Sequence, residues 1–331
     1  MNRTILISLL LACRVWAADI YVATNGTGDG SSWAQATNSI AGAAQFLTDN
    51  YAYEGGTVWI SNGVYTGVAW EGDFDTPINF QGKTGNPADI TLIGNGSDPV
   101  FRGYLSSYGC VDVTITGGGG EAALISSLAR NCVITGNVGT AAGGMKGGIA
   151  YWSTIGWNTS NGGAGGVVED GRLLMYSCLI VENTGRIGGA SGTDVDMFNC
   201  TVAGNVGTNG AGGLSGISAF RNSISWGNSG DEDTSIAGQV QYSCGQGDAY
   251  TNEFQVGCIT NDPLFVGSGD YHLQAGSPCI NTGTNSTWTL TTDADLDGNK
   301  RRWPAYGQTD MGAYEYESQS DYIRKWFLKV K

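Results

Sequence analysis

The sequence predicts an all-β protein, a single-stranded right-handed parallel β-helix, and three observations support this. Glycine supplies 54 of the 331 residues, while charged residues supply only 14%, where about 25% is typical. A unit of nearly constant length, with a period near 22, recurs along the middle of the chain, and glycine pairs and asparagines recur with it. Turns favour Gly and Asn, and short strands favour β-branched and aromatic residues. Helical bundles and Rossmann-type folds are therefore excluded.

The repeated unit contains an aromatic residue, a small residue two positions later and an aliphatic residue two positions further on. Its members recur at a nearly constant interval. Residues two apart share one face of a strand, and stacked coils lie about 4.8 Å apart, so each set is expected to form a ladder in the core. The aromatic set is Trp152, Tyr176, Phe198, Phe220 and Tyr242; the small set is Cys132, Thr154, Cys178, Cys200, Asn222 and Cys244; the aliphatic set is Ile134, Ile180, Val202 and Ile224.

Two further sets mark the corners of the coils. Paired glycines recur about once per coil, where we expect the backbone to need a positive φ angle. Asparagines recur at another corner, where an asparagine ladder is expected to hydrogen-bond the backbone of neighbouring coils. The glycines are Gly143, Gly144, Gly165, Gly166, Gly188, Gly189, Gly212 and Gly213, and the asparagines are Asn137, Asn158, Asn183, Asn205 and Asn228.

Five segments follow from this pattern. They are a signal peptide (1–17), an N-terminal strand and capping helix (18–56), the coils (57–260), an end block that closes the helix (261–317) and a tail (318–331). The capping helix is expected over residues 40–47, because Ile40, Ala43, Ala44 and Leu47 fall on one helical face. Such a helix would cover the open edge of the first coil.

The N-terminal residues predict export, with a secreted or cell-surface location. Arg3 precedes an apolar run over residues 4–12, and Val15 and Ala17 suit a signal-peptidase site. The alternative is a lipoprotein, lipidated at Cys13. The apolar run is too short to span a bilayer, and no later segment is predicted to be transmembrane.

The charge balance restricts the partners. Sixteen basic residues face 30 acidic ones, giving a net charge of −14. Nucleic acid is a poor partner and an anionic membrane surface is disfavoured, because few basic groups are present to neutralise phosphates. A monomer is predicted.

Several motifs resemble a known family. Residues 20–26 (IYVATNG), 30–34 (GSSWA) and 63–67 (GVYTG) are similar to the N-terminal part of bacterial secreted β-helix proteins. The C-terminal half carries DPLF (262–265), DYHL (270–273), GSP (276–278), DLDGN (295–299) and DMGAYE (310–315). This set resembles the end block of choice-of-anchor proteins, and the glycine-rich coils resemble polymorphic outer-membrane repeats. The resemblance covers about residues 19–317 and implies a β-helix at the cell surface, in a superfamily that includes pectate lyases.

Histidine and cysteine chemistry is limited. His272 is the single histidine and lies in the end-block motif, so we expect a structural role and exclude Ser-His-Asp catalysis, a Cys-His nucleophile and His-ligated zinc. Cys178 and Cys200 are expected to be free, stacked thiols, because neighbours in parallel register rarely have disulfide geometry. Cys258 with Cys279 is the pair considered for a disulfide.

One charged cluster is predicted on the outside of the coils. Asp194 and Asp196 flank an inward Val195, and Arg172 precedes Asp194 by one period of the repeat, so the two should be neighbours on adjacent coils. One interpretation is a surface ion pair. The other is a site that binds Ca²⁺ or a sugar acid, in which a lyase would need a cationic base of lowered pKa. The catalytic candidates are Asp194, Asp196, Arg172 and Arg186, and the substrate-binding candidates are Glu169, Asp170, Lys146, Tyr151 and Trp157; Lys146 is also a candidate base.

Aromatic residues outside the repeat phase are candidate sugar platforms. Besides Tyr151 and Trp157, Trp70 is out of phase with the ladders.

A second candidate site lies in the end block. Asp293, Asp295 and Asp297 precede Gly298, as at the start of a calcium loop. An EF-hand is excluded because Pro304 occupies the twelfth position. The alternative is a turn in which Arg301 and Arg302 pair with the aspartates.

Together these features predict an exported or cell-surface β-helix that binds polysaccharide. The alternatives are a polysaccharide lyase or glycoside hydrolase, and a structural surface protein or adhesin without catalysis. A tight charged cluster around Asp194 would favour an enzyme, and a flat Ser/Thr/Asn surface would favour a scaffold.

Overall fold

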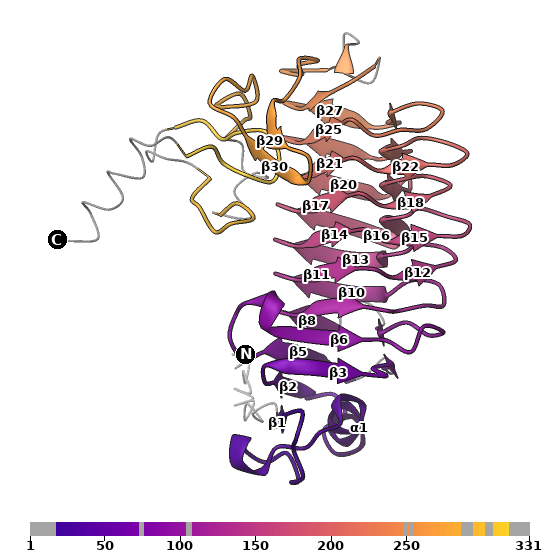
Figure 1. Cartoon of the computed structure of the whole chain (residues 1–331), viewed down its shortest axis with the longest axis vertical. Helices are drawn as coiled ribbons and strands as arrows, with labels where there is room; N and C mark the ends of the chain where they lie inside the picture. The colour runs from indigo at the N-terminus through magenta and orange to yellow at the C-terminus, as the bar shows by residue number, and fades with distance from the viewer. Residues whose placement is uncertain are drawn as a thin grey trace, which may run out of the picture.

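The computed structural model describes residues 18–72, 76–103, 108–247, 250–251, 255–285, 294–301 and 307–317. Within these ranges the chain forms a right-handed parallel β-helix of about eight turns, drawn as a vertical stack in Figure 1. The predicted fold class is confirmed. No helix in the described part of the chain is long and apolar enough to cross a membrane. The predicted signal peptide with Cys13, the tail, Asp293 and Arg302 lie outside the described residues.

The largest sheet, sheet A, runs along the whole stack with every pair parallel. Its first strands are β1 (Ala18–Val22), β2 (Gly56–Ile60), β5 (Ile78–Gly82), β8 (Tyr108–Val111), β10 (Leu124–Arg130), β13 (Met145–Tyr151) and β16 (Val167–Tyr176). Beyond β16 the sheet divides into two rows of shorter strands. One row is β19 (Ala190–Ser191), β23 (Leu214–Ser215) and β26 (Thr234–Ser235), and the other is β20 (Val195–Phe198), β24 (Ala219–Arg221) and β27 (Gln239–Gln241). Strand β4 (Trp70–Glu71) pairs with β7 (Phe101–Arg102), and β7 pairs in turn with β10.

Two further parallel sheets complete the coils. Sheet B contains β3 (Gly63–Thr66), β6 (Ile90–Ile93), β9 (Thr114–Thr116), β11 (Val133–Thr135), β14 (Thr154–Gly156), β17 (Leu179–Val181), β21 (Thr201–Ala203), β25 (Ile224–Trp226) and β28 (Cys244–Gly245). Sheet C contains β12 (Val138–Gly139), β15 (Thr159–Ser160), β18 (Thr184–Gly185) and β22 (Val206–Gly207). The end block has an antiparallel pair, β29 (Phe265–Gly267) and β30 (Asp270–Leu273). Two 3₁₀ turns, η1 (Trp33–Gln35) and η2 (Pro87–Asp89), lie in the first coils.

The capping helix forms as predicted and extends to Ile40–Asn50 (α1). The Ser39 hydroxyl accepts a hydrogen bond from Gly42 N at 2.9 Å, which satisfies one free N–H of the first turn. All four residues of the predicted apolar face are buried. The helix packs against β1 and β2, so it covers the first coil (Figure 1).

The predicted ladders form, but their register is partly wrong, and the aromatic ladder lies on the outer face of sheet A rather than in the core. Ile134, Ile180 and Val202 lie in one column of sheet B, in which Ile155 is the member between Ile134 and Ile180. Ile224 lies in the neighbouring column, because it pairs with Thr201 and not with Val202.

In the aromatic set only Tyr176 and Phe198 share a column. Their third member is Tyr151 rather than Trp152, and Phe220 and Tyr242 fall in neighbouring columns. The steps between register partners in this column are unequal in length, so a constant period misplaces some residues by one. The partners are, in order, Arg130, Tyr151, Tyr176, Phe198, Arg221 and Gln241.

The small-residue ladder is corrected in the same way. Cys178 and Cys200 occupy one column, where Ser153 and Ser223 accept hydrogen bonds from the backbone N–H groups of Cys132 and Cys200. Three residues of the predicted set miss this column by one position. Thr154 and Cys244 follow its members Ser153 and Ser243, and Asn222 precedes its member Ser223. The seven described cysteines are free thiols, so Cys258 and Cys279 are not joined.

The reason given for the glycine pairs is wrong. None of the eight has a positive φ angle. A Cβ atom on Gly143 would lie 2.4 Å from Gly165 O, and one on Gly188 would lie 1.9 Å from Gly212 O. Glycine is required because the carbonyl of the next coil occupies the space of a side chain.

Positive φ angles occur instead at a corner between sheets A and B. On six successive coils one residue there has a φ between 46° and 53°. These residues are Asn131, Trp152, Ser177, Asn199, Asn222 and Tyr242. This corner directs the chain from one sheet into the other, and it carries much of the contact with the end block.

The asparagine ladder is confirmed. Each side-chain Nδ2 donates to the Oδ1 of the asparagine on the next coil, at 2.9 to 3.0 Å from Asn137 to Asn228. Nδ2 also reaches a carbonyl of the preceding coil, as from Asn158 to Ile134 O at 2.8 Å. The ladder thus satisfies polar groups that the tight corner would otherwise leave buried without partners.

The end block lies beside the helix rather than closing its last coil. In Figure 1 it lies against the side of the solenoid where the sheet B strands β17, β21 and β25 are drawn. Leu179, Val181 and Ala203 on the outer face of sheet B form an apolar cluster with Tyr271 of the block, and Leu296 and Tyr314 pack against it. On the uncovered strands the same outward positions carry Thr114, Thr116, Thr135 and Thr154, which are partly exposed.

Arg301 fastens the block to the coils. Its side chain is 2% exposed and pairs with Glu315 Oε1 at 3.1 Å. It also donates to Ser177 Oγ at 2.9 Å and to the Asn199 carbonyl at 3.4 Å, both on the coils. The predicted alternative, Arg301 bonded to the calcium-loop aspartates, is replaced by this pairing with Glu315.

Candidate functional site

An aromatic stack lies on the outer face of sheet A. Met175 and Met197 point into the core, so the alternate residues Tyr176 and Phe198 point outward. Ring centroids are 5.0 Å apart from Tyr151 to Tyr176 and 5.1 Å from Tyr176 to Phe198, with nearly parallel planes. The rings therefore cover one another's faces. The Arg221 guanidinium lies over Phe198, which is buried, whereas both tyrosines are half-buried.

The predicted charged cluster forms beside this stack. Arg172 and Asp194 lie on adjacent coils, and Arg172 Nη2 pairs with Asp196 Oδ2 at 2.9 Å and Nε with Asp194 Oδ1 at 4.0 Å. Val195 points inward, as predicted. Ser218 Oγ donates to Asp196 at 2.8 Å, and Glu169 accepts the backbone N–H of Asp194. Residues 169–172 reach this surface because β16 bulges there. Val168 and Leu173 pair with Lys146 and Gly148, so residues 169–172 lie opposite the single residue Gly147 of β13.

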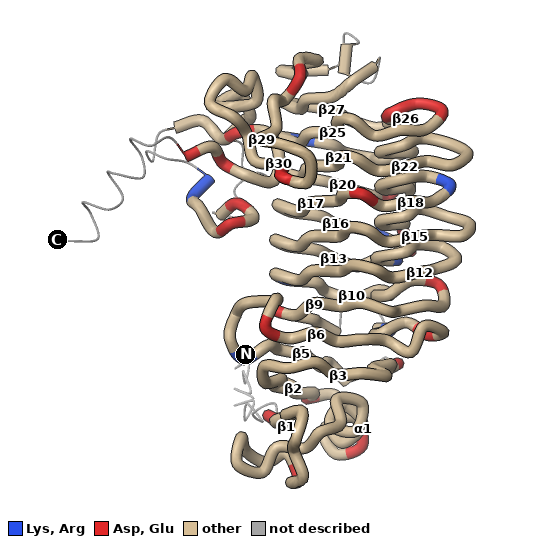
Figure 2. The backbone as a smooth tube through the Cα atoms, in the orientation of Figure 1, with Lys and Arg blue, Asp and Glu red and all other residues tan. Residues whose placement is uncertain are grey.

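Lys146 and Asp170 belong to a separate line of charges. It runs from coil to coil through Glu71, Arg102, Glu121, Lys146 and Asp170, with successive N–O distances of 3.6, 3.1, 2.5 and 3.5 Å. Every charge in this line has a partner of opposite sign. Figure 2 shows how few charges the coils carry besides these.

The electrostatics argue against a lyase base. The hydrogen bond from Lys146 to Glu121 raises the pKa of Lys146, and the bond to Asp196 raises the pKa of Arg172. A lyase base needs the opposite shift, because it must accept a proton near neutral pH.

Three predicted residues lie elsewhere. Arg186 is exposed in the turn after β18 and makes no ion pair within the described ranges. Trp157 is 53% exposed at the corner that follows β14. Trp70 is not a platform, because it is buried edge-to-face against Phe80 and Tyr108 in the core.

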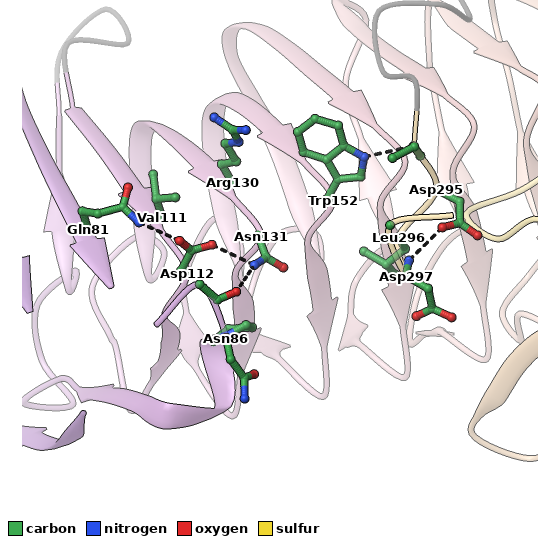
Figure 3. Close-up of a pocket in the computed structure, with 14 residues that line it drawn as sticks. Gln81, Asn86, Val111, Asp112, Arg130, Asn131, Trp152, Asp295, Leu296 and Asp297 are labelled. Atoms are coloured by element: carbon green, nitrogen blue, oxygen red, sulfur yellow. Dashed lines mark hydrogen bonds between the residues drawn. The ribbon is translucent and has the colours of Figure 1, made fainter. Parts of the chain in front are cut away.

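A cleft of about 660 Å³ separates the first coils from the end block. Its coil wall includes Gln81, Asp112, Arg130, Asn131 and Trp152, and its other wall is the loop at residues 294–298 (Figure 3). Sequence reasoning did not find this cleft, because its walls come from distant parts of the chain. The contact that closes it, from Trp152 Nε1 to Ala294 O at 3.0 Å, joins residues 142 positions apart.

The cleft combines fixed polar groups with an aromatic ring. Asp112 accepts from Gln81 Nε2 at 2.6 Å and Asn131 Nδ2 at 2.7 Å, which fixes its carboxylate. The exposed Arg130 guanidinium lies 5.4 Å from the Trp152 ring centroid and has no ion-pair partner among the described residues. Tyr151 lies 5.9 Å from Trp152, so the cleft adjoins the aromatic stack.

The predicted calcium residues have different tasks. Asp295 is fully buried and accepts backbone N–H bonds from Asp297 at 3.0 Å, Asn299 at 2.6 Å and Glu315 at 2.8 Å. Its carboxylate thus organises a turn, while Asp297 bonds to His272. No group of three or more His, Cys, Asp or Glu side chains suited to a metal occurs in the ranges described. Calcium binding with Asp293 stays a prediction.

His272 connects two parts of the end block. Its Nδ1 lies 2.6 Å from Asp270 Oδ1 and its Nε2 lies 2.7 Å from Asp297 Oδ2, and the ring stacks on Tyr314. Both ring nitrogens can donate only in the imidazolium form. Partial burial lowers the pKa of His272, but the bonds to Asp297 and Asp270 raise it more, so the net pKa is raised.

The end block is therefore expected to lose stability as the pH rises. A group whose pKa is raised by folding stabilises the fold below its unfolded pKa, and that contribution disappears as the pH rises through the folded value. Burial of Asp310, whose pKa is raised to about 6, acts in the same direction. We expect the melting temperature to fall between pH 5 and pH 8, and His272→Gln to flatten the profile. A wild-type profile that rises over this range would contradict this.

No protein-family model matches this chain, and no curated protein matches it significantly.

Proposed function

We propose that this protein is an exported or cell-surface β-helix that binds polysaccharide, and that the cleft beside Trp152 is its main binding site. The observation that carries the proposal is the pairing, in an open and polar cleft, of a planar indole with a guanidinium that has no ion-pair partner in the described part of the chain. The signal-peptide pattern of residues 1–17 and the resemblance to choice-of-anchor proteins support the location.

The chemistry of the cleft suits a sugar. A sugar ring has an apolar C–H face that packs on an aromatic ring and hydroxyl groups that need fixed donors and acceptors. Trp152 supplies the ring, and Asp112 and Asn131 supply polar atoms held in place by their own hydrogen bonds. These groups are on or next to strands of a rigid solenoid, which limits the entropy lost on binding.

A polymer that leaves the cleft would continue along the outer face of sheet A. Tyr151 adjoins Trp152, and Tyr176 lies on the next coil. We propose that Tyr151, Lys146, Glu169 and Asp170 contact such a chain as secondary groups. Trp157 remains a predicted contact on another face.

We favour binding over catalysis, although the tight charged cluster expected of an enzyme does form around Asp194. Asp194 and Asp196 both pair with Arg172, and the cations that a lyase would use have raised pKa values. A lyase or hydrolase, with Asp194, Asp196, Arg172 and Arg186 as catalytic residues, remains the alternative. An enzyme would release cleavage products from the glycan, so the binding test includes an assay for such products.

The test is a glycan array followed by affinity measurement on the best ligand. Arg130→Gln is expected to weaken binding about tenfold or more, because a charge-assisted hydrogen bond is worth about 1.5–3 kcal/mol. Arg186→Gln is the matched control, since Arg186 is also exposed and is remote from the cleft. Equal effects of the two variants, or no binding to any neutral or acidic glycan, would overturn the proposal.

Two further arms separate the alternatives. A loss of binding in Asp194→Ala without a loss in Arg130→Gln would move the site to the Arg172 cluster. Ultraviolet-absorbing products would indicate a lyase, and new reducing ends without absorbance would indicate a hydrolase. Because Asp295 and Asp297 border the cleft, the assay is run with Ca²⁺ and with a chelator, and loss in chelator would support calcium there.

A further inference from the structure

Two thiols meet where the end block contacts the last coils. Cys244 is in β28, the final strand of sheet B, and Cys279 is in the end block. Both are fully buried in one apolar cluster with Ile224, Leu273 and Met311. The Cys244 and Cys279 side chains are neighbours in this cluster, and Cys244 Sγ donates to Asn261 O at 3.2 Å. Cys279 therefore shares its cluster with Cys244, whereas Cys258, the partner considered from the sequence, packs against the main core.

We propose that Cys244 and Cys279 form a disulfide that covalently fastens the end block to the coils. The segment that carries Cys279 is already held at this place: Met311 N donates to Cys279 O at 3.0 Å, and Gly312 N donates to Asn222 O at 2.7 Å. The crosslink would thus join two surfaces that are in contact before it forms.

This pair is better suited to a disulfide than the other thiol contact. Cys178 and Cys200 are neighbours in a column of parallel coils, where both Cβ atoms point the same way and disulfide geometry is unfavourable. Cys244 and Cys279 come from a coil strand and a separate loop, so no parallel register fixes the orientation of their Cβ atoms. The chain between them includes the whole β29–β30 pair, and closing a long loop of this kind restricts the unfolded chain.

The reaction needs an oxidant of the disulfide class, such as oxidised glutathione. The Cys279 thiolate attacks one sulfur of the oxidant and releases a first glutathione thiolate. The Cys244 thiolate then attacks the Cys279 sulfur of the mixed disulfide and releases the second. Two protein thiols lose two protons and two electrons, and one oxidant disulfide becomes two thiols.

Burial determines when the crosslink forms. The neighbouring Cys279 thiol and burial both raise the pKa of Cys244, and only the thiolate is reactive. We therefore expect slow oxidation of the folded protein and faster oxidation during refolding, while the end block is docking and both thiols are still accessible.

The experiment is refolding of the full chain in a glutathione redox buffer, followed by alkylation in denaturant and peptide mass spectrometry. We expect a Cys244–Cys279 linked peptide, and a melting temperature about 5 °C or more above that of the reduced protein, which dithiothreitol reverses. Cys258→Ser, the matched control, should keep both.

Cys244→Ala and Cys279→Ala should each remove the linked peptide and the redox-dependent shift in melting temperature, while the reduced variants still melt cooperatively. If one variant does not fold, the other and the wild-type linkage map still decide. A Cys258–Cys279 or Cys178–Cys200 link, or full alkylation of all thiols after refolding, would overturn the proposal. None of these readouts depends on glycan binding.

Discussion

Replacing Arg301 with methionine is expected to detach the end block and to lower the free energy of unfolding by about 3–5 kcal/mol. Methionine keeps much of the stem but removes the charge that faces the buried Glu315 carboxylate. The carbonyls of Gly312 and Ala313, which Arg301 bonds at 2.9 and 3.0 Å, also lose their donor. Burial already raises the pKa of Glu315 to about 9, so without Arg301 its carboxyl either stays charged without a partner or binds a proton. Both outcomes cost more than breaking an ordinary surface pair.

Denaturant titration measures this loss, with Arg186→Met as the control. Arg186 is exposed and outside any described ion pair, so its replacement should cost less than about 0.5 kcal/mol. Adding Glu315→Gln to Arg301→Met should recover part of the stability, because it removes the buried carboxyl that has lost its cation. A loss in Arg301→Met no larger than that of the control would show that apolar packing alone holds the block.

Replacing Asn183 with alanine in the middle of the asparagine ladder is expected to cost about 3–5 kcal/mol. Its Nδ2 donates to Ile155 O and to Asn205 Oδ1, both at 2.9 Å. Its Oδ1 accepts the backbone N–H and the Nδ2 of Asn158, both at 3.0 Å. Alanine would leave these groups of three coils buried without partners, and each costs about 1–3 kcal/mol if no water replaces the amide.

The control for this variant is Asn209→Ala. Asn209 is an exposed asparagine of a nearby turn, so its replacement should change the free energy of unfolding by less than about 0.5 kcal/mol. Equal losses in the two variants would contradict the ladder as a source of stability.

The repeated contacts were predictable from the sequence. In a β-helix each residue meets the residue about one coil away, so the period of the repeat is also a map of neighbours. This is why Asn137 to Asn228, the thiols Cys178 and Cys200, and the pair of Arg172 with Asp194 lie where the spacing places them. The helix at Ile40–Asn50 was predictable for a local reason, since its apolar face and its Ser39 cap lie within one short segment.

Register errors arose where a coil departs from the mean length. The bulge at residues 169–172 lengthens the step from Tyr151 to Tyr176, and the step from Arg221 to Gln241 is shorter than the mean. A constant period therefore placed Trp152 in the aromatic ladder, although its φ of 46° puts it at the corner. For the glycine pairs the recurrence was correct but the cause was steric, and only the neighbouring carbonyls show that.

The sequence by itself determined the coil, its asparagine corner and the charges that stack on adjacent coils, because these contacts repeat and each repeat reports the same geometry. Only the tertiary structure decided where the end block docks, that Cys279 meets Cys244, and that Trp152 and Arg130 face a cleft. Each of these contacts occurs once and joins segments far apart in the chain. A single contact of that kind leaves no periodic signal, and it is selected by which outward faces, such as Leu179 and Val181 against Thr114 and Thr116, are apolar enough to be covered.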